Sequence, residues 1–180
     1  MRKLIVSNLM SLDGFFEGPD HELDWFAPDE EFFAYAREML RAVDTIIFGR
    51  VTYQHMAAYW PSAPKEEIAD AMNHLPKIVF SRTLDKTEWN NCRLVKGDAV
   101  EEIAELKHQP GKDMVILGSA MLASTLLQQG LIDEYRVIVS PILIGSGYPL
   151  FKGITNKIRL KLEKNKLLSS GVAVLYYQKA

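Results

Sequence analysis

In the sequence Met114-Val115-Ile116-Leu117-Gly118-Ser119, a continuously apolar run passes directly into a glycine and a small hydroxyl residue. Apolar runs without alternation are typical of strands that are covered on both faces, as in the middle of a parallel sheet. The segment 120–129 then predicts a helix that ends at Gly130, a residue type suited to the position after a helix C-terminus. A buried strand, a tight turn and a helix in this order predict an α/β layered domain.

Further strands and helices alternate on both sides of this stretch. Thr45-Ile46-Ile47-Phe48 and Lys77-Ile78-Val79-Phe80-Ser81 are two more short apolar runs that indicate buried strands. Pro28 suits the first position of a helix, and Asp98 with Glu101 forms a capping-box-like pair. The expected strands are 3–9, 45–48, 77–81, 92–96, 114–117, 135–140, 157–163 and 171–178, and the expected helices are 28–42, one beginning at Gly49, 98–107 and 120–129.

The last third of the sequence changes character. In the segment 157–163, Ile158, Leu160 and Leu162 alternate with charged residues, which predicts a strand with one solvated face. The segment 171–178 predicts a second such strand, so the two are expected to pair antiparallel. The expected sheet is therefore mixed, mostly parallel in the middle with antiparallel C-terminal strands, and has helices on both faces. The irregular stretch 10–27 is long for a compact domain and therefore points to a functional loop.

Composition places the chain among ordinary globular proteins. Its 180 residues predict a single domain spanning 1–180, and 48% hydrophobic with 24% charged residues excludes a disordered, collagen-like or coiled-coil chain. The net charge of −2 argues against a broad nucleic-acid footprint. Cys92 is the only cysteine, so no intramolecular disulfide is expected.

Several classes of chemistry lack their sequence signatures. The four histidines show no metal-ligand spacing, and no Walker A sequence, G-x-G-x-x-G or G-x-S-x-G occurs. No apolar window approaches the ~18 residues of a membrane span, and the N-terminus does not read as a signal peptide. We therefore expect a cytoplasmic protein that binds a small molecule and no metal, nucleic acid or membrane.

Polar residues gather just after the buried strands, where ligands of α/β sheets bind. After the expected strand 45–48, Gly49 would let a ligand approach the backbone, Arg50 could bind a phosphate, and Thr52 could donate to the same anion. An ordinary strand-to-helix turn with a solvent-facing arginine explains the same hexapeptide equally well. Ser81-Arg82-Thr83 repeats the pattern after the next strand, where a plain polar loop is the simpler alternative.

The third strand end is Gly118-Ser119, followed by the helix that begins near Ala120. The free amides of that first helical turn form an anion site suited to a pyrophosphate. The alternative is a tight connection in which Ser119 serves only as the N-cap. Three such strand ends in one small domain favour a joint functional interpretation.

The motifs occur in one order along nearly the whole chain. They are Ser11-Leu12-Asp13-Gly14, Gly49-Arg50-x-Thr52-Tyr53, Ser81-Arg82-Thr83, Leu117-Gly118-Ser119, Asp133-Glu134 and Ser140-Pro141-Ile142-Leu143-Ile144-Gly145-Ser146-Gly147. This set resembles the reductase domain of the bacterial riboflavin-biosynthesis deaminase-reductase, a family with a dihydrofolate-reductase-like fold. It fits stand-alone members best, because no deaminase half is present.

The resemblance implies that NADPH binds along one edge of the sheet. By position, Arg50 and Thr52 would contact cofactor phosphates, with Gly49 at the same turn. Ser81 and Arg82 would hold the adenosine 2′-phosphate and favour NADPH over NADH. The pyrophosphate would lie on Gly118, Ser119, Ala120, Met121 and Leu122, and Gly145 and Gly147 would let the chain pass close to the cofactor. The resemblance also implies a homodimer.

The substrate side follows from the loop after the first strand. The resemblance places Asn8, Ser11, Asp13 and Gly14 beside the substrate, with Tyr53 as a further lining residue. Asp13 could hydrogen-bond a polar substrate or supply a proton, but an Asp-Gly pair also shapes turns. Phe15-Phe16-Glu17 departs from the basic or small residue usual after Ser-Leu-Asp-Gly, and indicates a more apolar and more acidic pocket than a ribose phosphate needs.

The resulting hypothesis is an NADPH-dependent reductase of a planar or imine-containing heterocycle, resembling 5-amino-6-(5-phosphoribosylamino)uracil reductase. In such an enzyme the cofactor carries the chemistry, which explains why no strong catalytic constellation is visible. A non-catalytic nucleotide-binding or regulatory protein and a dimeric module without ligand remain as alternatives. Fold resemblance does not decide among them.

Overall fold

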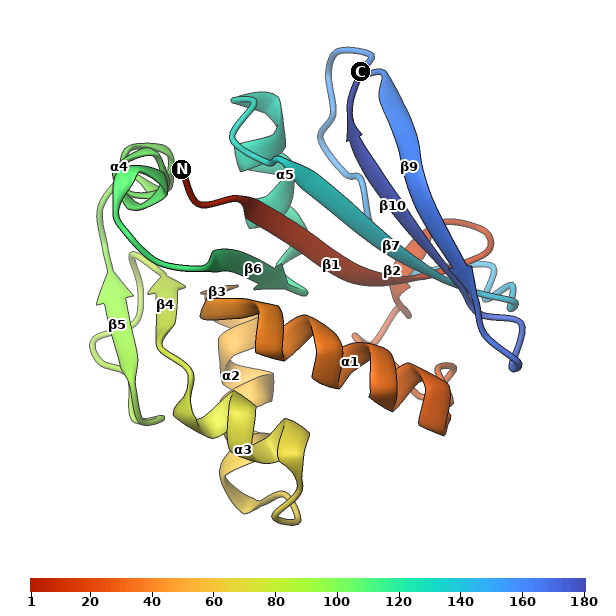
Figure 1. The fold of residues 1–180 in the computed structure, drawn as a ribbon, viewed down its shortest axis with the longest axis horizontal. Helices are drawn as coiled ribbons and strands as arrows, with labels where there is room; N and C mark the ends of the chain where they lie inside the picture. Colours follow the sequence, from red (N-terminus) through yellow and green to blue (C-terminus); the bar gives the residue numbers. More distant parts are fainter.

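A single eight-stranded sheet runs through the computed structural model, which describes residues 1–180 (Figure 1). The strand order across the sheet is β5-β4-β3-β6-β1-β7-β10-β9, and a separate two-stranded ribbon joins β2 to β8. The strands are β1 (Leu4–Ser11), β2 (Phe15–Glu17), β3 (Val43–Gly49), β4 (Lys77–Phe80), β5 (Cys92–Val95), β6 (Asp113–Leu117), β7 (Glu134–Ser140), β8 (Tyr148–Pro149), β9 (Leu160–Leu167) and β10 (Ala173–Lys179).

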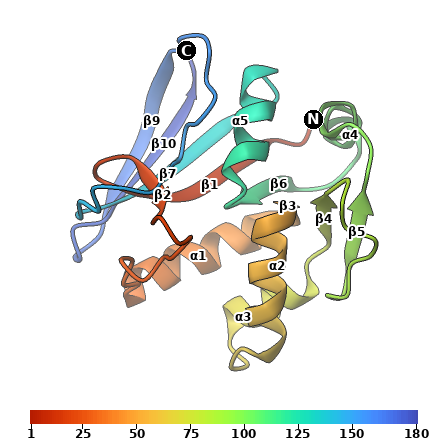
Figure 2. The same cartoon turned by 180° about the vertical axis from the view of Figure 1, so that it is seen from behind.

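Helices cover both faces of this sheet. They are α1 (Glu30–Ala42), α2 (Arg50–Tyr59), α3 (Glu67–His74), α4 (Ala99–His108) and α5 (Ala120–Gln128), with a 3₁₀ turn at Trp60–Ser62. Figures 1 and 2 show α1, α2 and α3 on one side of the sheet and α4 and α5 on the other. Two apolar clusters separate accordingly, one containing Met39 of α1 and the other Ile103 of α4 and Leu126 of α5. None of the helices is both long and apolar enough to cross a membrane.

The expected mixture of parallel and antiparallel strands is confirmed. The six neighbouring strands β5, β4, β3, β6, β1 and β7 pair in parallel, whereas β10 runs antiparallel to both β7 and β9. The apolar middle strands are buried as predicted, and Ile46, Ile47 and Phe48 each have 0% exposure. Asp98 caps α4 by accepting from the amides of Val100 and Glu101.

The stretch 10–27 is more regular than the sequence predicted. Strand β1 continues to Ser11, because β7 runs beside it and pairs Ser11 with Ser140. Three of the following residues, Phe15–Glu17, form β2 against Tyr148–Pro149, a long-range pairing that local sequence does not encode. Helix α1 begins at Glu30 rather than at Pro28, because the Asp29 carboxylate accepts from the amide of Phe32 at 2.7 Å and caps the helix there.

The strand predicted at 157–163 lies further along, at Leu160–Leu167. Its register is set by β10, which pairs Leu160 with Lys179 and Leu167 with Ala173. A covered apolar side was expected for this strand, but Leu162 is 45% exposed and Leu167 73% exposed. The reason is its place at the edge of the sheet, outside the area that the helices cover (Figure 1).

Lys77 opens β4 and is only 1% exposed. Its ammonium donates to the carbonyl oxygens of Met72 at 2.8 Å, Asn73 at 3.2 Å and Leu75 at 2.7 Å, at the C-terminal end of α3. The same Nζ lies 4.4 Å from the centroid of the Trp89 ring. Burial without a carboxylate partner lowers the pKa of Lys77 to about 8.

This environment predicts a pH dependence of stability. Relative to Lys77→Met, the protein with Lys77 should gain free energy of unfolding between pH of about 8 and 10.5, because there the unfolded chain holds a proton that the folded chain has released. Urea unfolding of both proteins in a Cys92→Ala background measures this, since burial raises the pKa of the neighbouring Cys92 thiol to about 11 and it titrates in an overlapping range. Parallel pH profiles would contradict the prediction.

Candidate functional site

The parallel strands end at two different levels, which creates a step at their carboxyl ends. Strand β6 stops at Leu117, opposite Ser7 of β1, while β1 itself continues to Ser11 beside β7. At about 3.3 Å per residue, the longer strands project about 13 Å past the end of β6. The ends of β6, β3 and β4 therefore lie at the foot of a wall that β1 and β7 form.

Four residues at the foot of this wall bind one another and form what we call the strand-end cradle: Gly49, Thr52, Gly118 and Ser119. The amide of Gly49 donates to Ser119 Oγ at 2.9 Å, and the amide of Ser119 donates to Thr52 Oγ1 at 2.9 Å. These bonds join the turn after β3 to the turn after β6. Both turns start helices, so the N-termini of α2 and α5 are held side by side.

The cradle needs glycine and an unusual backbone. Gly118 has φ +62°, and a Cβ placed there would stand 2.7 Å from Thr52 Cγ2. Ser119 also lies in the left-handed region, with φ 53°, and its hydroxyl caps none of the α5 amides because it accepts from Gly49 and donates to Leu117 O. The alternative in which the Ser119 side chain serves only as the N-cap is thus wrong. The first turn of α5, Ala120 to Leu122, keeps its amides without a side-chain cap, as an anion site requires.

The predicted phosphate-binding residues flank the cradle. Gly49 pairs with Phe80, so Ser81 and Arg82 follow β4 next to Arg50. Arg82 is exposed and has no ion-pair or hydrogen-bond partner, whereas Arg50 contacts only Gln54 of its own helix, at 3.1 Å. The Ser81 hydroxyl is partly engaged, since it accepts from the amides of Thr83 and Leu84. Two guanidinium groups are therefore available at one side of the cradle.

Asp13 joins the loop after β1 to the loop after β7. Its carboxylate accepts from Ser11 Oγ at 2.7 Å, from the Gly145 amide at 2.8 Å and from the Ile144 amide at 3.3 Å. The Ser11 hydrogen bond and these amides hold the pKa of Asp13 below its usual value. A carboxylate so held keeps its negative charge near neutrality, so this geometry supports the turn-shaping alternative and not proton donation.

The backbone conformation or close packing of these loops explains why glycine occurs at some of their positions. Gly14 has φ +93° and closes the turn at Asp13, with its amide donating to Ser11 O. A Cβ on Gly147 would stand 2.1 Å from the carbonyl oxygen of Glu17, so Gly147 is needed where the chain packs against β2. Gly145, with φ +77°, has open space around its Cα. The expectation that a cofactor passes close to Gly145 and Gly147 stays a prediction.

Two buried polar side chains near the wall have no partner. Asn8 is 2% exposed, and neither its Nδ2 nor its Oδ1 makes a hydrogen bond. Ser140 Oγ, at the end of β7, is likewise unpartnered, with the residue 3% exposed. Most buried polar groups in proteins are satisfied, so these orphans call for an explanation. The sequence analysis quoted Ser140 but assigned it no role, since only the β1–β7 pairing brings it opposite Ser11.

The Tyr53 side chain lies between α2 and the loop 84–89. It is 5% exposed, and its hydroxyl accepts from the amides of Glu88 and Trp89 at 3.0 and 3.3 Å. The side chain also borders a hollow of about 600 Å³ between α2 and the loop 84–89. Its hydroxyl anchors that loop, which gives Tyr53 a structural role, and its contact with a substrate stays a prediction.

Phe15-Phe16-Glu17 also differs from the sequence expectation of an apolar and acidic pocket. Phe16 packs against Val137 and Leu150, and Glu17 lies 2.6 Å from His21 Nδ1 with only 8% exposure. Both side chains are thus used to hold β2 in place. Only Phe15 remains half-buried without such a role.

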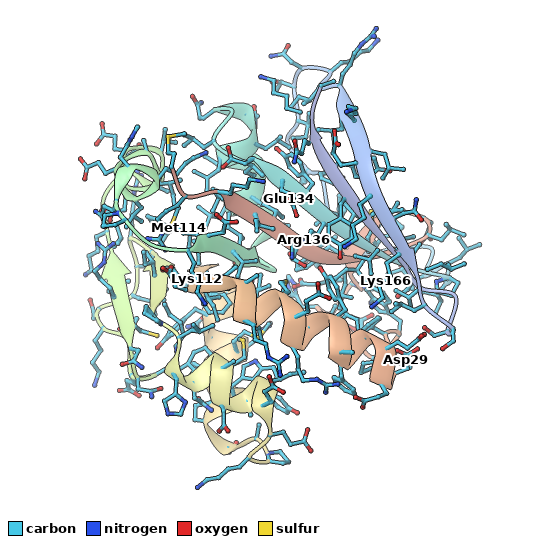
Figure 3. All side chains as sticks on the ribbon, in the orientation of Figure 1. Asp29, Lys112, Met114, Glu134, Arg136 and Lys166 are labelled. Carbon is cyan, nitrogen blue, oxygen red and sulfur yellow. The ribbon has the colours of Figure 1, made fainter.

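Asp133 and Glu134 make contacts that stabilise the sheet. Asp133 accepts from the Leu4 amide at 2.8 Å and from Lys107 Nζ at 2.5 Å, so it joins β1 to α4. Glu134 pairs with Arg136 at 2.6 Å, and Figure 3 shows these two side chains between α1 and the C-terminal strands. Arg136, which the sequence analysis missed, also lies 5.3 Å from the Tyr176 ring. No group of three or more His, Cys, Asp or Glu residues is placed to hold a metal ion.

A mostly parallel sheet with antiparallel C-terminal strands and helices on both faces defines a dihydrofolate-reductase-like α/β domain. The RibD C-terminal domain model matches residues 2–174. The chain therefore belongs to the RibD C-terminal domain family.

Individual relatives span nearly the whole chain. The Bacillus subtilis (strain 168) protein YyaP, described as uncharacterized, is 34% identical over 182 residues that cover 98% of this chain and 94% of YyaP. A putative riboflavin biosynthesis protein from Shewanella sp. PV-4 superposes with a TM-score of 0.79 at 24% identity, covering 99% of each chain. A deaminase/reductase from Thermotoga maritima superposes with a TM-score of 0.72 at 13% identity, but only 57% of that chain is covered.

The close approach at Gly118 predicts a specific loss of stability. Gly118→Ala should cost about 1–2 kcal/mol for the left-handed backbone and about 1–3 kcal/mol more for the contact with Thr52. Gly130→Ala is a matched control, because Gly130 has φ +69° but nothing within 4 Å of an added Cβ. Urea unfolding of both variants isolates the contact. Equal losses would show that Thr52 moves aside freely.

The Asp13 anchor predicts a local change in loop protection. Asp13→Ala should speed hydrogen exchange at the Ile144 and Gly145 amides by about tenfold or more, because both lose their acceptor. Exchange in the sheet should stay unchanged. Asp20→Ala is the control, since the Asp20 carboxylate has no partner. Unchanged exchange at Gly145 would show that other contacts hold the loop.

Proposed function

We propose that the protein is an NADPH-dependent reductase of a small planar heterocyclic or imine-containing molecule. The observation that carries this proposal is the strand-end cradle with the uncapped first turn of α5 beside it. Backbone amides at a helix N-terminus form a binding site for a pyrophosphate. The Shewanella and Thermotoga maritima proteins, described as a putative riboflavin biosynthesis protein and a deaminase/reductase, support the same activity.

The residues present fit NADPH. Arg82 is exposed and unpaired on one side of the cradle, where it can bind a phosphate with two parallel hydrogen bonds. On the other side, the doubly unpartnered Asn8 offers hydrogen bonds that nothing in the protein uses. Charge at one end and an unused amide at the other suit a ligand that has phosphates at one end and a polar ring at the other.

The substrate class rests on similarity and on the walls of the site. The Thermotoga maritima protein is named as a diaminohydroxyphosphoribosylaminopyrimidine deaminase and a 5-amino-6-(5-phosphoribosylamino)uracil reductase. In the present chain, Glu17 and Phe16 are occupied with holding β2, and half-buried Phe15 follows the Asp13 turn. We therefore propose a pyrimidine-like or pterin-like ring as substrate.

Bound reduced nicotinamide would supply the hydride for this reaction. The chain supplies orientation: the α5 amides and the hydroxyl hydrogen of Thr52 would bind the phosphates, and the wall of β1 and β7 would support the rings. The Gly49 amide already donates to Ser119 Oγ and shapes the cradle instead. Asp13 keeps the loops after β1 and β7 together at the far end of the site. Its lowered pKa leaves proton transfer to the substrate to another group or to water.

Cofactor titrations test the proposal. The protein should bind NADPH in the micromolar range and more tightly than NADH, and Arg82→Ala should weaken NADPH binding roughly 10- to 100-fold while leaving NADH binding nearly unchanged. Isothermal titration calorimetry measures both, with Arg159→Ala as the control for loss of one surface charge. Absence of binding by either nucleotide would overturn the proposal. Binding without oxidation of NADPH by any of a panel of pyrimidines and pterins would favour a regulatory nucleotide-binding protein.

A further inference from the structure

Asn8 is the buried polar group that the fold explains least. With 2% exposure and both side-chain atoms unpartnered, its carboxamide has one free acceptor and one pair of free donor hydrogens. Leaving such a group unsatisfied lowers stability, whereas an apolar side chain of the same size would carry no such penalty at this position. An asparagine here is therefore unfavourable for folding alone and calls for a ligand.

The register places Asn8 at the cradle. Ser7 pairs with Leu117, the last residue of β6, so Asn8 is the first residue of β1 beyond it and stands beside Gly118. Side chains alternate along β1, and Val6, two residues earlier, packs in the cluster that contains Ala123 and Leu126 of α5. Asn8 thus points to the α5 face of the sheet, where the uncapped α5 amides lie.

The β2–β8 ribbon covers this part of the sheet. Val137 is the register partner of Asn8 on β7, and it packs against Phe16 of β2 and Leu150, the residue after β8. The ribbon is short, with Phe15 paired to Pro149 and Glu17 to Tyr148. A ligand ring that reaches Asn8 must displace this cover or slide beneath it, so the ring becomes enclosed together with the carboxamide.

We propose that Asn8 binds the amide edge of a ligand ring, its Oδ1 accepting from the ligand N–H and its Nδ2 donating to the ligand carbonyl. This inference rests on the proposed function. Two sources carry that edge: the carboxamide of the nicotinamide and the lactam of a pyrimidine. The place of Asn8 beside Gly118 and the start of α5 favours the nicotinamide. Because the pair is enclosed, a ring without the matching hydrogen bonds is rejected strongly.

The test compares ligands that differ only at this edge. The wild-type protein should bind NADPH at least tenfold more tightly than its reduced 3-acetylpyridine analogue, in which a methyl group replaces the amide nitrogen. In Asn8→Leu this ratio should fall to about one. Binding of 2′-phospho-ADP-ribose, which lacks the ring, should be the same in both proteins, and Asn165→Leu on exposed strand β9 is the matched control.

A stability measurement accompanies the titrations and needs no ligand. Asn8→Leu should raise the urea midpoint of the free protein, because it removes two unsatisfied polar atoms without opening a cavity. If that variant fails to fold, the ligand comparison on the wild-type protein still tests the proposal. A lower midpoint for Asn8→Leu in a folded protein would show that the carboxamide already has partners, and would overturn the inference.

The remaining outcomes distinguish the nicotinamide from the pyrimidine as the ligand of Asn8. They also distinguish failure of the Asn8 inference from failure of the proposed reductase function. If Asn8→Leu retains the preference for NADPH but loses binding of uracil, the lactam is the source of the amide edge. If neither ligand distinguishes the variant from the wild type, the inference is wrong while the reductase proposal stands. If the wild type binds 2′-phospho-ADP-ribose but shows no preference between NADPH and its analogue, the nicotinamide assignment alone fails. If it binds no nucleotide, the proposed function fails first.

Discussion

The unequal pairing of β1 with its two neighbours is the constraint on which the rest of the site depends. β1 stays beside β6 only as far as Ser7 but beside β7 as far as Ser11. A sheet in which all parallel strands stopped at one level would present a flat edge. The difference in length instead creates a wall above the ends of β6 and β3, at the place where α2 and α5 begin. The strand-end cradle then lies at the foot of this wall, and the two loops that Asp13 joins lie at its far end.

Several features of this edge are unfavourable for stability. Gly118 and Ser119 both lie in the left-handed region, α5 begins without a side-chain cap, and two buried side chains lack partners. Each feature costs of order 1–3 kcal/mol in a typical protein. Features of the same kind occur outside this edge, since His21 and Asn91 also have positive φ and Trp25 Nε1 is also unpartnered. The middle strands themselves are regular, with Ile46, Ile47, Val115 and Ile116 fully buried. Unfavourable features that gather at one edge of an otherwise regular sheet are typical of a binding site.

Other polar residues that could have suggested chemistry are explained by the architecture. Glu17 pairs with His21 and holds β2, and Asp133 joins β1 to α4. The buried Lys77 ammonium donates to three carbonyl oxygens at the end of α3. Tyr53 anchors the loop 84–89. In each case the test is whether the polar atoms already have partners. Asn8, Ser140 and Arg82 do not, and this difference marks the residues that remain available to a ligand.

The sequence by itself determined the elements whose causes are local. Apolar runs such as 45–48 and 114–117 placed the buried strands, Asp98 placed the start of α4, and the ordered motifs at the strand ends indicated the family. The tertiary structure alone decided what depends on pairing between distant segments: the extension of β1 to Ser11, the β2–β8 ribbon, the shift of β9 to Leu160–Leu167 and the structural roles of Tyr53 and Asp13. The physical reason is that hydrogen-bond satisfaction is a property of pairs. A sequence shows that Asn8 and Tyr53 carry polar groups, but only the folded chain shows that the Tyr53 hydroxyl finds two amides and that Asn8 finds no partner.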